Sequence, residues 1–179
     1  MRRRIVTGRD ATGRSVITRE EDLVEVAYRH TPGFAQSLVW STAAPACPEA
    51  DGSGPLSQYV PGPGETVALT VTFPPDSVFA DPGFDAESAV AENRRNSPGL
   101  ADLFEADVPG MHTTPSVDYA VVLEGEVVLE LDDGQSTKLV PGDLVVQNGT
   151  RHAWRVPGDK PATIFVVLIG HAGAPARIH

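Results

Sequence analysis

His112 stands in the stretch Gly110-Met111-His112-Thr113-Thr114-Pro115-Ser116-Val117-Asp118, which continues through an apolar run to Gly125. Forty residues later, His152 stands in Gly142-Asp143-Leu144-Val145-Val146-Gln147-Asn148-Gly149-Thr150-Arg151-His152-Ala153-Trp154. Both stretches hold short runs of β-branched and apolar residues next to glycines, which is typical of strands. Side chains alternate across a strand, so His112, Thr114 and Asp118 share one face of an unbroken strand, as His152 and Trp154 do. Pro115 predicts a kink or bulge between them.

The C-terminal half repeats this strand pattern at short intervals. We expect strands at 117–123, 127–132, 137–140, 143–147, 152–156 and 163–169. Asp132-Asp133-Gly134 ends in the Asp-Gly sequence of a tight hairpin turn. Strands at this spacing, with no helices between them, predict an antiparallel sandwich or barrel.

The N-terminal part mixes strands with one loop and one helix. Strands are expected at 3–7, 14–18, 37–41 and 66–73. Segment 43–64 is rich in Pro, Gly, Ala and Ser and predicts a surface loop. Segment 85–96 predicts a helix, because Asp85 can cap its first turn. Its apolar stripe is expected to consist of Ala86, Ala89 and Val90. A short turn with Leu100, Leu103 and Phe104 on one face then leads into His112.

The two histidine stretches resemble the paired signature of the cupin superfamily. In that signature one strand gives His-X-His, three or four residues, Glu, six residues and Gly. The other gives Gly-Asp, an apolar run and Pro-X-Gly-X-X-His. Thr114 stands at the second histidine of the signature and Asp118 at its glutamate. The second stretch is one residue short, and Gln147-Asn148 replaces its proline region.

The resemblance implies an all-β fold, an antiparallel cupin β-barrel of jelly-roll type. Residues 110–170 would form the barrel core. Residues 1–109 would be an N-terminal extension that supplies edge strands, one short helix and a cover, and 171–179 a C-terminal tail. Cupins commonly form dimers, so a homodimer is expected.

The resemblance also implies a metal pocket with His112, His152 and Asp118 as ligands. Two imidazoles and one carboxylate suit a divalent ion of Fe, Mn, Ni or Zn. Asp118 could instead be a general base or orient His112, or do neither. Thr114 is a poor ligand but could orient a water or a substrate oxygen. The candidate catalytic residues are therefore Asp118, His152 and Thr114.

Other side chains near these strands are assigned by their parity. Trp154 is expected to form a wall of the substrate pocket, and Gln147 to reach its rim. Trp40 is a third candidate for the pocket, with core packing as its alternative. Arg151 and Arg155 alternate with His152 and are expected to point outward to solvent or a partner subunit. Tyr119 alternates with Asp118 and is likewise expected to point outward or toward a subunit contact.

Composition limits the partners. The net charge of −10 argues against nucleic acid and against anionic lipid, which both require a basic face. Cys47 is the one cysteine, so no internal disulfide is possible and a reducing compartment is expected. No apolar segment follows the N-terminal Met1-Arg2-Arg3-Arg4, and no run approaches the ~20 apolar residues of a membrane span. A cytoplasmic, soluble protein is expected.

Three functions remain open. The first is a metal-dependent lyase, isomerase or cyclase acting on a carbonyl- or hydroxyl-bearing apolar, aromatic or polyketide-like small molecule. The second is a non-haem Fe(II) dioxygenase using the same two histidines and carboxylate. The third is a non-catalytic cupin that binds a small ligand without metal. Glycine-rich nucleotide loops and the Gly-X-Ser-X-Gly elbow are absent, which argues against dinucleotide and serine-hydrolase chemistry.

Overall fold

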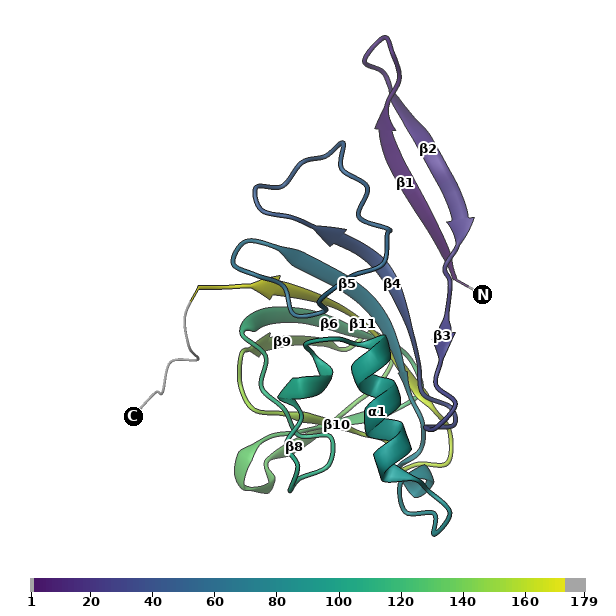
Figure 1. The fold of residues 1–179 in the computed structure, drawn as a ribbon, viewed down its shortest axis with the longest axis vertical. Coiled ribbons are helices and arrows are strands. Elements are labelled where there is room, and N and C mark those ends of the chain that lie inside the picture. Colours follow the sequence, from purple (N-terminus) through teal and green to yellow (C-terminus); the bar gives the residue numbers. More distant parts are fainter. Residues whose placement is uncertain (1, 173–179) are drawn as a thin grey trace.

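Two facing antiparallel sheets form the body of the protein in the computed structural model, which describes residues 2–172 (Figure 1). The larger sheet has the order β3 (Val26–Ala27), β4 (Ala35–Thr42), β5 (Thr66–Phe73), β11 (Ala162–Gly170), β6 (Ser116–Glu124) and β9 (Leu144–Asn148). The smaller sheet has the order β10 (Ala153–Arg155), β7 (Val127–Glu130) and β8 (Ser136–Leu139). The predicted all-β, cupin-like fold is therefore confirmed, although the two sheets do not close into one continuous barrel.

The core lies between the two sheets. Along β11, buried residues alternate with half-buried ones, so that Ile164, Val166 and Leu168 point inward. Val127 and Leu129 of β7 belong to the same buried cluster. Each such side chain contributes roughly 1.5–3 kcal/mol when it leaves water, so this cluster fixes which face of the large sheet is the inner one.

The helix α1 (Ala86–Asn96) docks through polar contacts. Its capping residue is Asp85, which accepts a hydrogen bond from the Ser88 N–H at 3.0 Å, as predicted. The predicted apolar stripe is only partly correct, because Ala89 is buried whereas Val90 is 50% exposed. Glu92 occupies the buried face instead and accepts the backbone N–H groups of residues 29 and 30.

A buried polar chain joins α1 to the large sheet. Gln36 of β4 donates to the Asn96 carbonyl at 2.9 Å and accepts from the Ser97 hydroxyl at 3.1 Å. The Tyr28 hydroxyl lies 2.8 Å from that of Ser97, and burial raises the pKa of Tyr28 to about 12. Because a buried polar group left unpaired is costly, these contacts fix the position of the helix.

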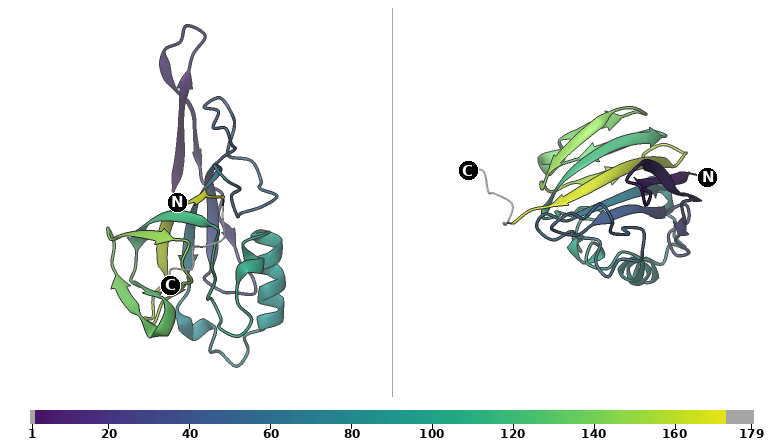
Figure 2. Two further views of the ribbon diagram at one scale, coloured as in Figure 1. Left: turned by 90° about the vertical axis from the view of Figure 1, so that its left-hand side faces the viewer. Right: turned by 90° about the horizontal axis from the view of Figure 1, so that it is seen from above.

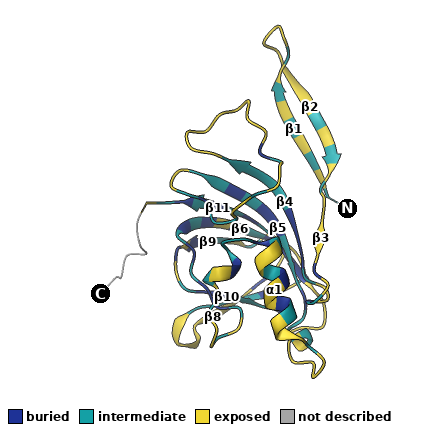
Figure 3. Ribbon diagram, in the orientation of Figure 1, coloured by how far each residue is buried: buried dark blue, intermediate teal, exposed yellow. Residues whose placement is uncertain are grey.

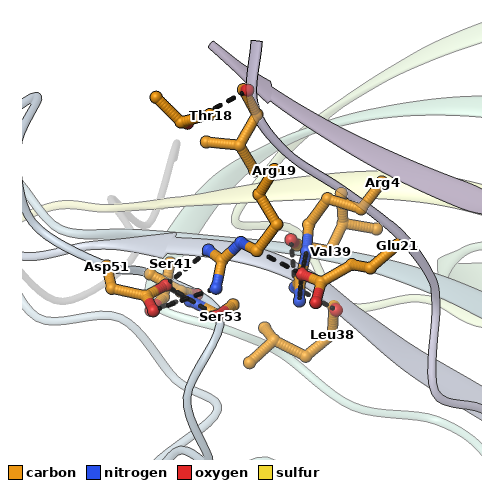
Figure 4. Close-up of polar contacts among 11 residues, drawn as sticks. Arg4, Thr18, Arg19, Glu21, Leu38, Val39, Ser41, Asp51 and Ser53 are labelled. Carbon is orange, nitrogen blue, oxygen red and sulfur yellow. Dashed lines mark hydrogen bonds and ion pairs between the residues drawn. The ribbon is translucent and has the colours of Figure 1, made fainter. Parts of the chain in front are cut away.

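The strands β1 (Arg3–Arg9) and β2 (Ser15–Asp22) form a separate hairpin, here called the arm. The arm projects beyond the body and is largely exposed (Figures 1, 2 and 3). At its base Arg4 donates to the Val39 carbonyl at 3.0 Å, and Arg19 pairs with Asp51 at 2.9 Å (Figure 4). Both guanidinium groups lie within 6 Å of the centre of the Trp40 ring, at 5.9 and 5.7 Å.

The predicted turn at Asp132-Asp133-Gly134 joins β7 to β8. Asp133 and Gly134 have φ angles of 56° and 73°, the left-handed conformation that a tight hairpin favours. The two-residue strand β3 is too short to show the alternation of polar and apolar residues that predicts a strand. Most of the predicted C-terminal tail, residues 173–179, lies outside the described residues.

Candidate functional site

His112 and His152 lie side by side between the sheets. The His112 N–H donates to the His152 carbonyl at 3.0 Å, and the His152 N–H donates to the His112 carbonyl at 2.9 Å. Residues that exchange both backbone hydrogen bonds are directly opposite in an antiparallel pair, so their side chains share a face. The two ring centres are accordingly 4.3 Å apart.

Each ring has a backbone carbonyl beside its Nδ1. His112 Nδ1 lies 3.1 Å from the Gly110 oxygen, and His152 Nδ1 lies 2.9 Å from the Thr150 oxygen. A carbonyl can only accept, so both oxygens favour a proton on Nδ1 and a lone pair on Nε2. At His152 the Gln147 amide, 3.1 Å from Nδ1, favours the other tautomer. Among residues 2–172 neither Nε2 has a hydrogen-bond partner, and no buried side-chain polar atom there is left unpaired. Both Nε2 atoms therefore face water-accessible space.

Burial keeps both imidazoles neutral. It lowers the pKa of His112 to about 4, with a further contribution from the nearby His152, and it lowers the pKa of His152. A neutral imidazole with its Nδ1–H on a backbone carbonyl is the form that binds metal ions through Nε2.

Gln147 supports His152 from the edge strand β9. Its amide donates to the Thr150 carbonyl at 2.8 Å and to the Thr150 hydroxyl. The Thr150 carbonyl lies within hydrogen-bond distance of both Gln147 Nε2 and His152 Nδ1. The amide nitrogen also lies 3.1 Å from His152 Nδ1, where it can donate only to an unprotonated Nδ1. Gln147 is 3% exposed, and it therefore belongs to the buried surroundings of the imidazole.

Asp118 is buried on β6, directly opposite Gln147 of β9. It accepts a hydrogen bond from the Ser116 hydroxyl at 2.6 Å and a long one from the Thr114 hydroxyl at 3.5 Å. Burial raises the pKa of Asp118 to about 6, against the opposing effect of these two hydroxyls.

The arrangement differs from the predicted three-ligand set. In the part of the chain that the structure describes, no three His, Cys, Asp or Glu side chains are grouped as metal ligands. Asp118 nevertheless keeps the parity expected from His112, because residues 112, 114, 116 and 118 are buried and residues 113, 115 and 117 are half-buried. Asp118 pairs with Gln147 of β9, whereas His112 pairs with His152.

A row of aromatic rings extends from the imidazole pair. Phe104 stacks on His112 with ring centres 4.4 Å apart. On the other side Trp154 meets His152 edge to face at 6.1 Å and stacks with Phe73 at 6.3 Å. Phe104 was not among the predicted site residues, although its position just before His112 in the sequence was the available signal.

Three further residues lie elsewhere than expected. Trp40 pairs with Ala68 on the outer face of the large sheet, under the arm, and so points away from the imidazoles. Arg151 binds both oxygens of Glu105 at 2.6 and 2.7 Å and also Asp132. Arg155 binds Glu130 and the Pro109 carbonyl, both at 2.6 Å. The two arginines meet carboxylates of their own chain instead of solvent.

The two imidazoles supply some, but not all, of the ligands that a transition-metal ion needs. Two neutral imidazoles with free Nε2 atoms can supply two nitrogen ligands to a divalent ion. Water and substrate would have to fill the remaining positions, because the described residues group no third side chain with them.

Residues 104–168 match the family model of the cupin domain. This segment of the chain is a cupin domain. The chain is 52% identical over 63 residues to phomopsin biosynthesis cluster protein C′ of Diaporthe leptostromiformis, covering 32% of this chain and 33% of that protein. It is 26% identical over 169 residues to the cupin-domain-containing oxidoreductase srdB of Neurospora crassa, and the match covers 93% of this chain and 72% of that protein.

Among solved structures, this cupin resembles a cupin-superfamily sugar phosphate isomerase from Silicibacter pomeroyi, with a TM-score of 0.44 and 17% identity over 83% of this chain and 71% of that one. The matched stretch spans about a third of the length of the first curated relatives. In the described residues no helix is long and apolar enough to cross a membrane.

Proposed function

We propose that this cupin is a metal-dependent enzyme acting on a small molecule, with His112 and His152 as the protein ligands of a divalent ion. One observation carries the proposal. The Nδ1 atom of each imidazole lies at hydrogen-bond distance from a backbone carbonyl, and among residues 2–172 neither Nε2 has a hydrogen-bond partner. Metal-ligating histidines usually have this arrangement, with one ring nitrogen on a backbone carbonyl and the other available to the ion.

The chain's own residues support lyase, isomerase or cyclase chemistry. An ion of Fe, Mn, Ni or Zn would supply a Lewis acid for a carbonyl, enol or carboxylate oxygen. Asp118 would accept a proton from the carbon next to a carbonyl, held in position by Ser116 and Thr114. Return of that proton to another carbon gives isomerisation, and departure of a β-hydroxyl as water gives dehydration.

The surroundings favour an apolar or aromatic substrate. Phe104 and Trp154 flank the imidazole pair and offer flat hydrophobic surfaces to a ring. A polyketide-like molecule bearing a carbonyl or hydroxyl group matches both these rings and the metal ligands. The names of two relatives place them in a phomopsin biosynthesis cluster, which supports a role in the biosynthesis of a small molecule.

Metal binding by the purified full-length chain tests the proposal. Titration calorimetry with Fe(II), Mn(II), Ni(II) and Zn(II) should give near-stoichiometric binding to the wild type. His112→Ala and His152→Ala should each lose it, while His30→Ala, which changes a histidine outside the pair, should keep it. Circular dichroism checks that each variant is folded. Unchanged affinity in both folded pair variants would remove His112 and His152 as ligands.

An oxidoreductase is the second candidate, because several relatives carry that name. Two protein ligands leave coordination positions for both oxygen and substrate. Oxygen uptake by the Fe(II)-loaded protein with an aromatic or polyketide substrate distinguishes the two. Uptake that depends on substrate favours the oxidoreductase, and turnover without uptake favours the lyase or isomerase.

A further inference from the structure

Gln147 has a side-chain oxygen that no residue of the described chain uses. Its amide nitrogen donates to the Thr150 carbonyl at 2.8 Å, and a carbonyl can only accept, so the nitrogen must be the atom on that side. The amide oxygen Oε1 has no hydrogen-bond partner among residues 2–172. Because no fully buried side-chain polar atom there lacks a partner, Oε1 reaches water-accessible space although Gln147 is only 3% exposed.

This oxygen lies beside the imidazole pair. Gln147 Nε2 is 3.1 Å from His152 Nδ1, which places the whole amide group next to the His152 ring. On the large sheet, Gln147 of β9 lies directly opposite Asp118 of β6, and both side chains are buried. Directly opposite residues share a face, so Oε1 lies close to both a proposed metal ligand and the proposed base.

The donors around this oxygen are already in use. The Ser116 hydroxyl donates to Asp118 at 2.6 Å, and the Thr114 hydroxyl makes a long hydrogen bond of 3.5 Å to the same carboxyl group. The Gln147 amide nitrogen faces Thr150 and His152. The atom that stays free is an acceptor, so its donor has to come from a bound molecule.

The cupin signature does not supply this acceptor. Gln147-Asn148 stands where the signature has its proline region, and a proline side chain has no hydrogen-bonding atom. Burying an amide costs free energy unless its polar atoms find partners. A glutamine buried here with its oxygen unpaired is therefore suited to a ligand that brings a donor.

We propose that Gln147 determines substrate specificity, because its Oε1 accepts a hydrogen bond from a hydroxyl group on the α or β carbon of a substrate ketone. The proposal rests on the proposed function, which places the carbonyl oxygen at the His112–His152 pair. The amide lies at the Nδ1 side of the His152 ring and the carbonyl would lie at its Nε2 side. One imidazole ring separates the two positions, so the hydroxyl and the carbonyl group can be only a few bonds apart.

Hydrogen bonding favours the hydroxyl over a methyl group of the same size. A ligand that displaces water from Oε1 without returning a hydrogen bond leaves a buried acceptor unpaired. A site built to bind a substrate hydroxyl therefore rejects the analogue that lacks it. We expect a hydroxy ketone to bind at least about tenfold more tightly than its methyl isostere.

Two isosteric pairs of aromatic ketones test the proposal in titration calorimetry of the full-length chain saturated with Zn(II). The first pair is α-hydroxyacetophenone and propiophenone, and the second is β-hydroxypropiophenone and butyrophenone. The wild type should prefer the hydroxy ketone about tenfold in at least one pair, and in Gln147→Leu the affinity ratio should fall to about one. Gln58→Leu, the same change at an exposed glutamine of the loop 43–64, should keep the wild-type ratio.

The two ketones without a hydroxyl group report on the fold of the variant. Neither donates to Oε1, so both should bind Gln147→Leu at least as tightly as the wild type. Gln147→Met, with an unbranched side chain of similar length, should give the same loss of preference if leucine distorts β9.

A ratio near one for both pairs in the wild type would overturn the proposal. A preference that persists in folded Gln147→Leu and Gln147→Met would overturn it as well, by assigning the hydroxyl to another acceptor or to the ion. Failure of the wild type to bind Zn(II) would count against the proposed function instead. The same ratios measured on the metal-free chain would then still decide the role of Gln147.

Discussion

Replacing Asp118 by Asn should stabilise the protein near neutral pH. The carboxyl group is buried, with 5% of the residue exposed, and its pKa is raised from 3.8 to about 6. The folded state therefore binds this proton more tightly than the unfolded state does. The stability that Asp118 contributes is complete below about pH 4 and is lost as the pH rises through about 6. An amide has no charge to bury and keeps an oxygen for the Ser116 hydroxyl.

The magnitude follows from the two pKa values. A difference of about 2 units corresponds to about 3 kcal/mol at pH 7.5, since each unit is worth 1.36 kcal/mol. About 1 kcal/mol of this is already lost at pH 4.5, because the unfolded carboxyl ionises first. Asp118→Asn should thus gain about 2 kcal/mol relative to wild type between pH 4.5 and pH 7.5.

Urea unfolding of both proteins at the two pH values measures this change. The difference between variant and wild type removes the contribution of all other titrating groups, which the two chains share. Asp159→Asn, an exposed substitution of the same kind, should show no such dependence. An Asp118→Asn difference that is the same at both pH values would refute the argument, because it would mean that ionising the buried carboxyl costs nothing.

Three other substitutions test single contacts. Gly125→Ala should destabilise the fold by about 3 kcal/mol in thermal unfolding, because Gly125 has a φ of 73° and a Cβ there would lie 2.4 Å from the Pro161 carbonyl. Gln147→Leu should weaken metal binding by about tenfold in calorimetry, through loss of an amide beside the His152 ring. Arg151→Leu should lower the urea midpoint only slightly, since its two carboxylate partners are partly exposed and the ion pairs are screened by solvent.

Most strands could be predicted because local sequence determines them. The alternation of polar and apolar residues predicted β5 with the bounds that the structure shows. The Asp-Gly sequence correctly predicted the turn between β7 and β8. The helix was also predicted from its cap. Its buried side could not be, because the glutamate at position 92 is buried by backbone donors of a distant loop, and no pattern within α1 shows that contact.

The imidazole pair could be predicted as a pair, since each histidine sits in its own motif. Parity placed Asp118 on the buried side with His112, but its contacts with the Ser116 and Thr114 hydroxyls could not be read from parity. Phe104 reaches His112 through an isolated bridge. Trp40 reaches the outer face after a register shift in β4, a local irregularity that the sequence does not show.

The buried carboxyl connects stability to the proposed chemistry. Placing Asp118 out of water lowers the stability of the folded protein at neutral pH, and a fold selected for stability alone would favour an amide there. Its two hydroxyl neighbours, Ser116 and Thr114, recover only part of that loss, because the pKa still rises. A carboxyl group with a pKa near the working pH is what proton transfer requires. Asp118→Asn should therefore give a more stable and less active protein, whereas a purely structural role for Asp118 gives higher stability with activity unchanged.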